Sequence, residues 1–173
     1  TEEVLGTNEM ISVTYTHLSQ DIKLGESILI DDGKIELKVT KIINKTQIEC
    51  VIENGGILSS KKGFNLPDTE ISIPSLTEKD IVDLDFIIQH HVDWIALSFV
   101  RKSEDIIDLR KRIAAQHGTQ KIIAKIEKPE AIKNIDSIIH DADAIMIARG
   151  DLAVEVPIEE MPIIQKMIIV KCI

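Results

Sequence analysis

Short runs of alternating apolar and polar residues fill the chain as far as about residue 66. The run Ile28-Leu29-Ile30 is followed by Asp31-Asp32-Gly33 and then by apolar residues at positions 35, 37 and 39. Asp-Gly between two apolar runs predicts a β-hairpin, because both residues tolerate the positive φ angles of a tight turn. A second strand pair is expected around Asn54-Gly55-Gly56, with its return strand at Ile57-Leu58. Several short strands in succession predict a small β-barrel.

After Pro74 the apolar residues change from the period of strands to that of helices. The segment from Thr77 to Asp80 predicts a capping box, and the apolar residues that follow it share one helical face. Apolar runs at 94–100, 121–126 and 144–148 then alternate with helical patterns. We expect the later helices to be bounded by Ser103, Gly118, Pro129, Pro162 and Cys172.

The order predicted for residues 77–173 is helix–strand–helix–strand–helix–strand–helix. Strands that are apolar on both faces are typical of a buried parallel sheet, so this is either a doubly wound sheet or part of a (β/α)8 barrel. A complete barrel needs eight strands and roughly 250 residues. Since three strands are predicted and residues 169–173 end in an apolar helix without a C-cap, we expect a piece of a larger protein. The alternative is a small complete α/β domain.

Composition narrows the possible partners. The chain is 44% apolar and 28% charged, which is enough for a packed core. Its net charge of −9 disfavours nucleic-acid binding and a polybasic membrane patch, both of which need clustered Lys and Arg. Cys50 and Cys172 form no metal or disulfide framework, so a reducing compartment is expected. The sequence contains no run of about 18 apolar residues, so no membrane span is expected.

Lys125 and Glu127 end the second of the buried strands. Because side chains alternate along a strand, both should point to the same side. A cation and a carboxylate are costly at the end of a buried strand unless they are paired or used, and barrel active sites lie at this edge of the sheet. The alternative for this pair alone is an exposed ion pair.

The next strand ends in Ala148-Arg149-Gly150-Asp151. We expect Gly150 to permit a sharp turn, and the free N–H groups of a helix that opens there can bind an anion. Asp151 should then lie near Glu127, and Mg²⁺ usually takes one or two carboxylates from a protein. The alternatives are a plain N-cap by Asp151 and an Arg-Gly-Asp adhesion loop, which the position at the end of a buried strand disfavours.

Together these residues predict Mg²⁺-assisted phosphoryl transfer. Lys125 would neutralise the phosphoryl group, and this reaction needs mostly positioning and charge stabilisation. One rival is a metal-dependent aldolase or lyase that acts on pyruvate-like enolates. The other is a module that only binds a partner.

Several motifs resemble pyruvate kinase, in the same order along essentially the whole chain. They are LIDDGKIELKV at 29–39, KKGFNLP at 61–67, LTEKD at 76–80, SFVR at 98–101, IIAKIE at 122–127 and IMIARGDLAVEVP at 145–157. The resemblance implies an α/β protein in which residues 1–68 form a small all-β barrel lid, called domain B. Residues 69–173 would form a partial (β/α)8 TIM barrel, about strands four to six.

The resemblance also implies an activity, transfer of the phosphoryl group of phosphoenolpyruvate to ADP, which gives pyruvate and ATP in glycolysis. It makes Lys125 the catalytic group and Glu127 and Asp151 the ligands of Mg²⁺ or Mn²⁺. The backbone N–H groups of Gly150 and Asp151 would hold the substrate carboxylate.

Asp32 and Lys62 match positions of the lid that approach the nucleotide; from the residues alone, a turn and a solvated charge explain them equally well. The K⁺ ligands would lie outside these residues. The full-length parent is expected to be a cytoplasmic homotetramer.

Some residues depart from the family pattern. Lys128 and Pro129 follow Glu127, where the family commonly has asparagine and, further on, a glycine. Ala153 replaces a usual glycine, and Phe64 and Asp68 replace smaller residues at the lid hinge. Because the resemblance places the phosphate-binding arginine outside the chain, the 173 residues alone are predicted to be inactive.

Overall fold

The computed structural model describes residues 4–173 and shows an α/β chain. The chain divides into two compact units, an N-terminal unit of Thr1–Ser72 and a C-terminal unit of Ile73–Ile173. The sequence had suggested a boundary between residues 68 and 69. No helix in the described residues is both long and apolar enough to cross a membrane.

The N-terminal unit is built on an antiparallel sheet with the strand order β3-β2-β1-β4. Its elements are α1 (Leu18–Asp21), β1 (Ser27–Ile30), β2 (Ile35–Ile42), β3 (Ile48–Asn54) and β4 (Phe64–Asn65). Its core is a cluster of buried aliphatic side chains, namely Leu18, Ile22, Ile28, Ile30, Ile35, Val39 and Leu66. The strand pairings leave this sheet open over the described residues, rather than closed as a barrel.

One of the two predicted hairpins forms. Ile30 pairs with Ile35 across the turn, and Asp31, Asp32 and Gly33 have φ angles of 54°, 57° and 79°. The prediction of a hairpin at Asn54-Gly55-Gly56 is wrong, because β3 pairs with β2 and residues 57–58 form no strand. Two adjacent apolar residues lack the alternation that a half-buried strand needs, and Ile57 is 98% exposed.

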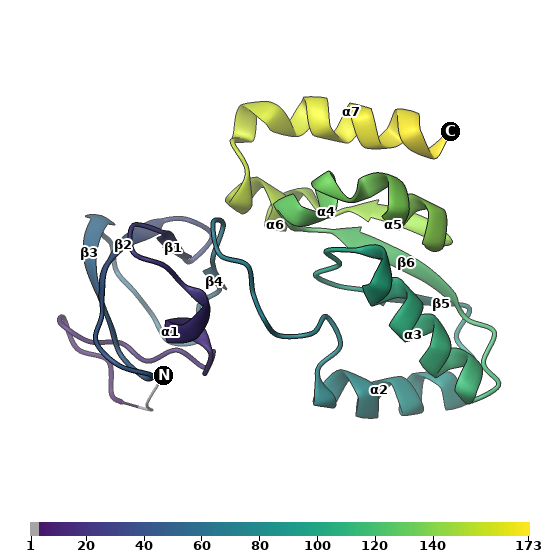
Figure 1. Cartoon of the computed structure of the whole chain (residues 1–173), viewed down its shortest axis with the longest axis horizontal. Helices are drawn as coiled ribbons and strands as arrows, with labels where there is room; N and C mark the ends of the chain where they lie inside the picture. Colours follow the sequence, from purple (N-terminus) through teal and green to yellow (C-terminus); the bar gives the residue numbers. More distant parts are fainter. Residues whose placement is uncertain (1–3) are drawn as a thin grey trace. The chain divides into compact units, whose positions relative to one another are not determined.

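The C-terminal unit alternates helices with the parallel strands β5, β6 and β7, as predicted (Figure 1). Its elements are α2 (Glu78–Gln89), β5 (Trp94–Leu97), α3 (Ser103–Ala115), β6 (Lys121–Ile126), α4 (Pro129–Lys133), α5 (Ile135–Asp141), β7 (Ala144–Ile147), α6 (Arg149–Glu155), the 3-10 turn η1 (Ile158–Glu160) and α7 (Met161–Cys172). A helix was expected to open at Gly150, but its end at Glu155, before η1 and α7, was not predicted.

The ends of α2 and α3 show how well local signals fix helix boundaries. The capping box of α2 is confirmed, since Thr77 N–H donates to Asp80 and Asp80 N–H donates to Thr77 Oγ1. At α3 the N-cap is Lys102 rather than Ser103. At the C-terminus of α3 the positive φ is at His117. Gly118 has a different role, because a Cβ there would lie 2.9 Å from Ile113 Cγ2 and 3.2 Å from the Ile113 carbonyl oxygen.

The helices of this unit cover one face of its sheet. The buried side chains of this face pack against those of α2, α3, α5 and α7; they are Ile95, Leu97, Ile122, Ala124 and Ile126. On the other face Trp94 and Met146 are each 43% exposed. The strands were expected to be buried on both sides; within the described residues only the helix-facing side is covered.

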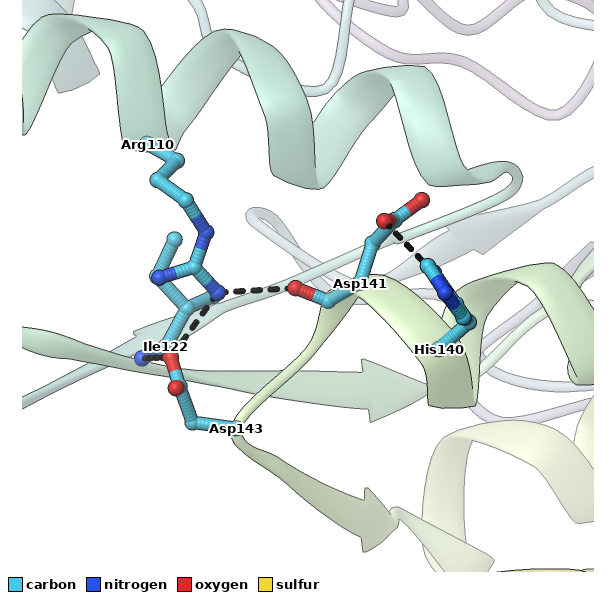
Figure 2. A network of polar contacts seen from close by, with 5 residues as sticks. All are labelled: Arg110, Ile122, His140, Asp141 and Asp143. Atoms are coloured by element: carbon cyan, nitrogen blue, oxygen red, sulfur yellow. Dashed lines mark hydrogen bonds and ion pairs between the residues drawn. The ribbon is translucent and has the colours of Figure 1, made fainter.

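A polar network fixes the end of the sheet at which the strands begin (Figure 2). Asp143 Oδ2 accepts from the Ile122 N–H at 2.8 Å and from Arg110 Nη2 at 2.9 Å. Arg110 also donates to the carbonyl of Asp141 at 2.7 Å. The Ile122 N–H and then Arg110 hold the pKa of Asp143 below its ordinary value, so this carboxylate ties α3, β6 and the start of β7 together as an anion.

Candidate active site at the ends of the parallel strands

The residues predicted to carry the chemistry lie where β5, β6 and β7 end. The parallel register pairs Leu97 with Ala124 and Ile126 with Ile147, so the carboxyl ends of the strands are neighbours. Ser98 and Phe99 follow β5, Glu127 follows β6, and α6 begins at Arg149, one residue after Ala148. Parallel βα units place strand ends and helix starts at one edge of the sheet, where ligands commonly bind.

The structure brings Lys125 and Glu127 into direct contact. Lys125 Nζ lies 2.6 Å from Glu127 Oε1, and it also donates to Ser98 Oγ at 3.1 Å. The side chain of Lys125 is 25% exposed and that of Glu127 is 2% exposed. The pair is therefore largely enclosed at the strand ends, which disfavours the alternative of an exposed ion pair and leaves the ammonium group partly open.

Glu127 has a second partner that the sequence did not reveal. The Phe99 N–H donates to Glu127 Oε2 at 2.7 Å, and Phe99 adopts a φ angle of 53° while its side chain is 51% exposed. A positive φ is unfavourable for an aromatic residue and is often found at functional sites. The backbone at the end of β5 thus holds the carboxylate of Glu127 in place. The SFVR motif directly after the strand was the available signal.

Helix α6 contains the whole Arg149-Gly150-Asp151 segment. The N-cap of α6 is Ala148, so Asp151 is not a capping residue, and the tripeptide is not an exposed loop. The chain does turn directly from β7 into α6, but the change of direction is at Ala148, and Gly150 lies within the helix without a positive φ. A Cβ at Gly150 would meet nothing within 4 Å, so the space above its Cα is open for a ligand.

A buried ion pair joins α6 to the end of β6. Lys128 Nζ lies 2.5 Å from Glu155 Oε1, and the two side chains are 8% and 1% exposed. Lys128 directly follows Glu127, and Glu155 is the last residue of α6. The sequence had marked Lys128 only as a departure from a family pattern, and the structure supplies its partner.

Glu127 and Asp151, the carboxylates predicted to hold a divalent cation, follow neighbouring strands at this edge. Residues 4–173 contain no group of three or more His, Cys, Asp or Glu side chains that could hold a metal ion. Glu127 is buried and oriented by two partners, whereas the exposed carboxylate of Asp151 has no hydrogen-bond or ion-pair partner within the described chain. A pair of carboxylates suits Mg²⁺, which keeps several waters and takes the rest of its ligands from a bound phosphate or carboxylate.

The other two predicted residues lie in the N-terminal unit. Asp32 is in the β1–β2 turn, and Lys62 pairs with the neighbouring Asp31 at 2.9 Å. The ammonium groups of Lys62 and then Lys34 hold the pKa of Asp31 below its ordinary value, and Asp31 raises the pKa of Lys62. The turn therefore carries a small exposed cluster of charges of both signs.

Comparison with known proteins gives a consistent result over the whole chain. The family model described as pyruvate kinase, barrel domain, matches residues 1–173. The chain is 47% identical over 172 residues to a pyruvate kinase of Geobacillus stearothermophilus, covering 98% of the chain and 29% of that protein. It is also 47% identical over 172 residues to a pyruvate kinase of Clostridium perfringens, covering 99% and 36% respectively. The chain thus spans about a third of the length of these relatives.

Proposed function

The chain belongs to the pyruvate kinase family, and from this membership we propose that it is part of an enzyme that transfers the phosphoryl group of phosphoenolpyruvate to ADP. The products are pyruvate and ATP. The observation that carries the proposal is the Lys125–Glu127 pair, enclosed at the carboxyl ends of neighbouring parallel strands. We place this enzyme in the cytoplasm as a homotetramer.

Within that enzyme, residues 69–173 would supply strands four to six of a (β/α)8 barrel. The proposal is supported by three parallel strands whose helices lie on one face, with Trp94 and Met146 exposed on the other. The remaining strands of a barrel would cover that second face. Residues 1–68 would form the lid domain, and the antiparallel sheet of the N-terminal unit is compatible with this role.

Lys125 is the proposed catalytic residue. Its ammonium group is partly exposed, and the contacts to Glu127 and Ser98 fix its direction. In a phosphoryl transfer this charge would stabilise the transferred group and then the enolate oxygen that is left behind. The Gly150 and Asp151 N–H groups would hold the substrate carboxylate, and the open space above Gly150 supports this role.

Glu127 and Asp151 are the proposed ligands of Mg²⁺ or Mn²⁺. The bound ion would supply positive charge that neutralises the substrate oxygens. Asp32 and Lys62 would contact the nucleotide from the lid, where Lys62 would exchange its contact with Asp31 for a phosphate oxygen. The K⁺ ligands are expected outside these residues.

A coupled assay of the longer protein in which we propose this chain resides tests the function directly. ATP formation from phosphoenolpyruvate and ADP should require Mg²⁺ and should be lost in Lys125→Ala. If the protein instead cleaves or forms carbon–carbon bonds of pyruvate-like substrates without making ATP, an aldolase or lyase is the better assignment. If calorimetry finds no Mg²⁺-dependent binding of phosphoenolpyruvate, the strand ends are not an active site.

A further inference from the structure

The buried ion pair between Lys128 and Glu155 connects the two segments that carry the candidate site. Lys128 is bonded to Glu127 in the chain and is the N-cap residue of α4. Glu155 closes α6, the helix that contains Gly150 and Asp151. Its Oε1 lies 2.5 Å from Lys128 Nζ, 27 residues away in sequence.

Such a pair contributes little to stability by itself. Removing two charges from water costs free energy that their attraction repays only when the geometry is good, and a well-packed apolar pair of similar size is often as stable. Unlike an apolar contact, an ion pair requires a particular direction and distance between its two charged groups. The benefit of Lys128 and Glu155 is therefore to be sought in what they align.

Helix α6 needs an external contact to hold its orientation. It has seven residues, and a helix of that length is not stable in isolation. Asp151 and Glu155 are four residues apart, so they lie on the same side of α6, one turn from each other. Leu152 and Glu155 are the buried residues of α6, while Asp151 is exposed. Leu152 packs in the apolar core, and the Lys128–Glu155 contact adds a directional anchor on the side of the helix that presents Asp151.

We propose that the Lys128–Glu155 ion pair sets the position of the Asp151 carboxylate relative to Glu127 and thereby the affinity for the divalent cation. Lys128 and Glu155 are positioning residues in this scheme, since neither ligates the cation. The inference rests on the proposed function, in which Glu127 and Asp151 hold that cation. It also gives a physical role to the Lys128 departure from the family pattern.

A simple field effect makes a different prediction. The ammonium group of Lys128 repels a cation bound at the neighbouring Glu127, so its removal alone would strengthen binding of the metal. Removal of the Glu155 charge would weaken binding. If the pair acts by alignment, both single changes weaken binding, and combining them adds nothing because the first has already removed the directional contact of α6.

The test measures Mn²⁺ affinity of the longer protein by electron paramagnetic resonance, with no substrate present. We expect Lys128→Met and Glu155→Gln each to weaken Mn²⁺ binding about 10-fold or more, which is the usual effect of losing a residue that orients a metal ligand. The double variant Lys128→Met/Glu155→Leu replaces the pair by apolar side chains and should melt near the wild-type temperature. It should still bind Mn²⁺ about 10-fold more weakly, and no more weakly than either single variant.

Arg110→Met is the matched control for a loss of stability. Arg110 forms an ion pair with Asp143 in the same unit, at the opposite end of the strands. Its removal should lower the melting temperature and leave Mn²⁺ affinity unchanged.

Either of two results would overturn the inference: unchanged or tighter Mn²⁺ binding by Lys128→Met, or wild-type affinity in the double variant. The variant Glu127→Gln distinguishes failure of this inference from failure of the proposed function. If Glu127→Gln does not weaken Mn²⁺ binding, the metal site itself is wrong and the inference fails with it. If Glu127→Gln abolishes binding while the Lys128 and Glu155 variants bind normally, the metal site stands and the inference alone fails.

Discussion

At the scale of single residues, Lys125 is the side chain whose loss should affect chemistry most directly. We expect Lys125→Met in the longer protein to lower kcat about 10²–10³-fold, as removal of one positioned charge-stabilising donor commonly does. The KM for phosphoenolpyruvate should change much less, because the charge acts mainly on the transition state. Steady-state kinetics at saturating Mg²⁺ measure both constants.

Lys121→Met is the control for that variant. Lys121 begins the same strand, is exposed, and lies over the Trp94 ring at 5.2 Å, far along the strand from the candidate site. Its removal should leave kcat within about twofold, since surface changes of this kind are usually small. Equal losses in the two variants would mean that Lys125 contributes to folding rather than to catalysis.

Two glycines of the C-terminal unit should respond in opposite ways to an added methyl group. Gly118→Ala would place a Cβ 2.4 Å from Gln120 Oε1 and 2.9 Å from Ile113 Cγ2, so we expect a loss of about 1–3 kcal/mol in unfolding free energy. Gly150→Ala meets nothing within 4 Å, so stability should hold or rise by up to about 1 kcal/mol. Substrate affinity should nevertheless fall in Gly150→Ala, because the methyl group enters the proposed ligand space.

Urea unfolding and calorimetry with phosphoenolpyruvate measure the two effects separately. Normal substrate affinity in Gly150→Ala would contradict the role proposed for the α6 backbone. A stable Gly118→Ala variant would show that Gln120 and Ile113 can move away.

The sequence predicted part of the site because that part depends on local geometry. The two-residue period of a strand is enough to place Lys125 and Glu127 on one side, and the structure has them 2.6 Å apart. The Phe99 N–H that binds Glu127 lies 28 residues from it in sequence, and the Glu155 carboxylate that binds Lys128 lies 27 residues from it. Both contacts depend on how the βα units pack. No local pattern specifies that packing.

At the scale of elements, the same distinction explains the predictions that failed. The hairpin at Asp31-Asp32-Gly33 is set by its own turn residues and was predicted correctly. Gly55-Gly56 is an equally good turn signal, but the residues after it lack strand alternation, and β4 forms later at Phe64–Asn65. A helix was expected to open at Gly150, but the bounds of α6 were not predicted, because a helix of seven residues depends on tertiary contacts.

The network around Asp143 predicts how the sheet responds to acid. The pKa of Asp143 is lowered in the fold, chiefly by the Ile122 N–H and then by Arg110. The stability from this carboxylate is therefore complete above the ordinary aspartate pKa and is lost as the pH falls through the lower, folded value. We expect Asp143→Asn to lower unfolding free energy at pH 7 by about 1–2 kcal/mol, because a hydrogen bond to a charged group is lost.

The measurement is a series of urea midpoints from pH 7 to pH 3 on wild type, Asp143→Asn and a control. Asp136→Asn is the control, because the Asp136 side chain is 77% exposed and its pairing with Lys171 should contribute little. Wild type should lose more stability than Asp143→Asn on acidification. Parallel curves for these two proteins would contradict the role given to Asp143.

At the scale of the whole molecule, the open face of the sheet is the main feature that the sequence predicted incorrectly. A continuous apolar run predicts burial on both sides, and this chain covers one. The hydrophobic pattern of β5 to β7 thus predicts more burial than the helices of this unit provide. Sequence periodicity detects how much burial a strand needs, but it cannot say which segment provides it.

The proposed function predicts that further strands complete the candidate site. Barrel enzymes assemble catalytic groups from the ends of several strands, and the parallel sheet of residues 4–173 supplies three. We expect the purified 173-residue chain to form no measurable pyruvate from phosphoenolpyruvate and ADP, while the longer protein does so under the same conditions. The uncovered apolar face should also promote self-association, which light scattering can follow. Turnover by the purified chain that disappears in Lys125→Ala would contradict the prediction, because it would show that Lys125, Glu127 and Asp151 suffice without further strands.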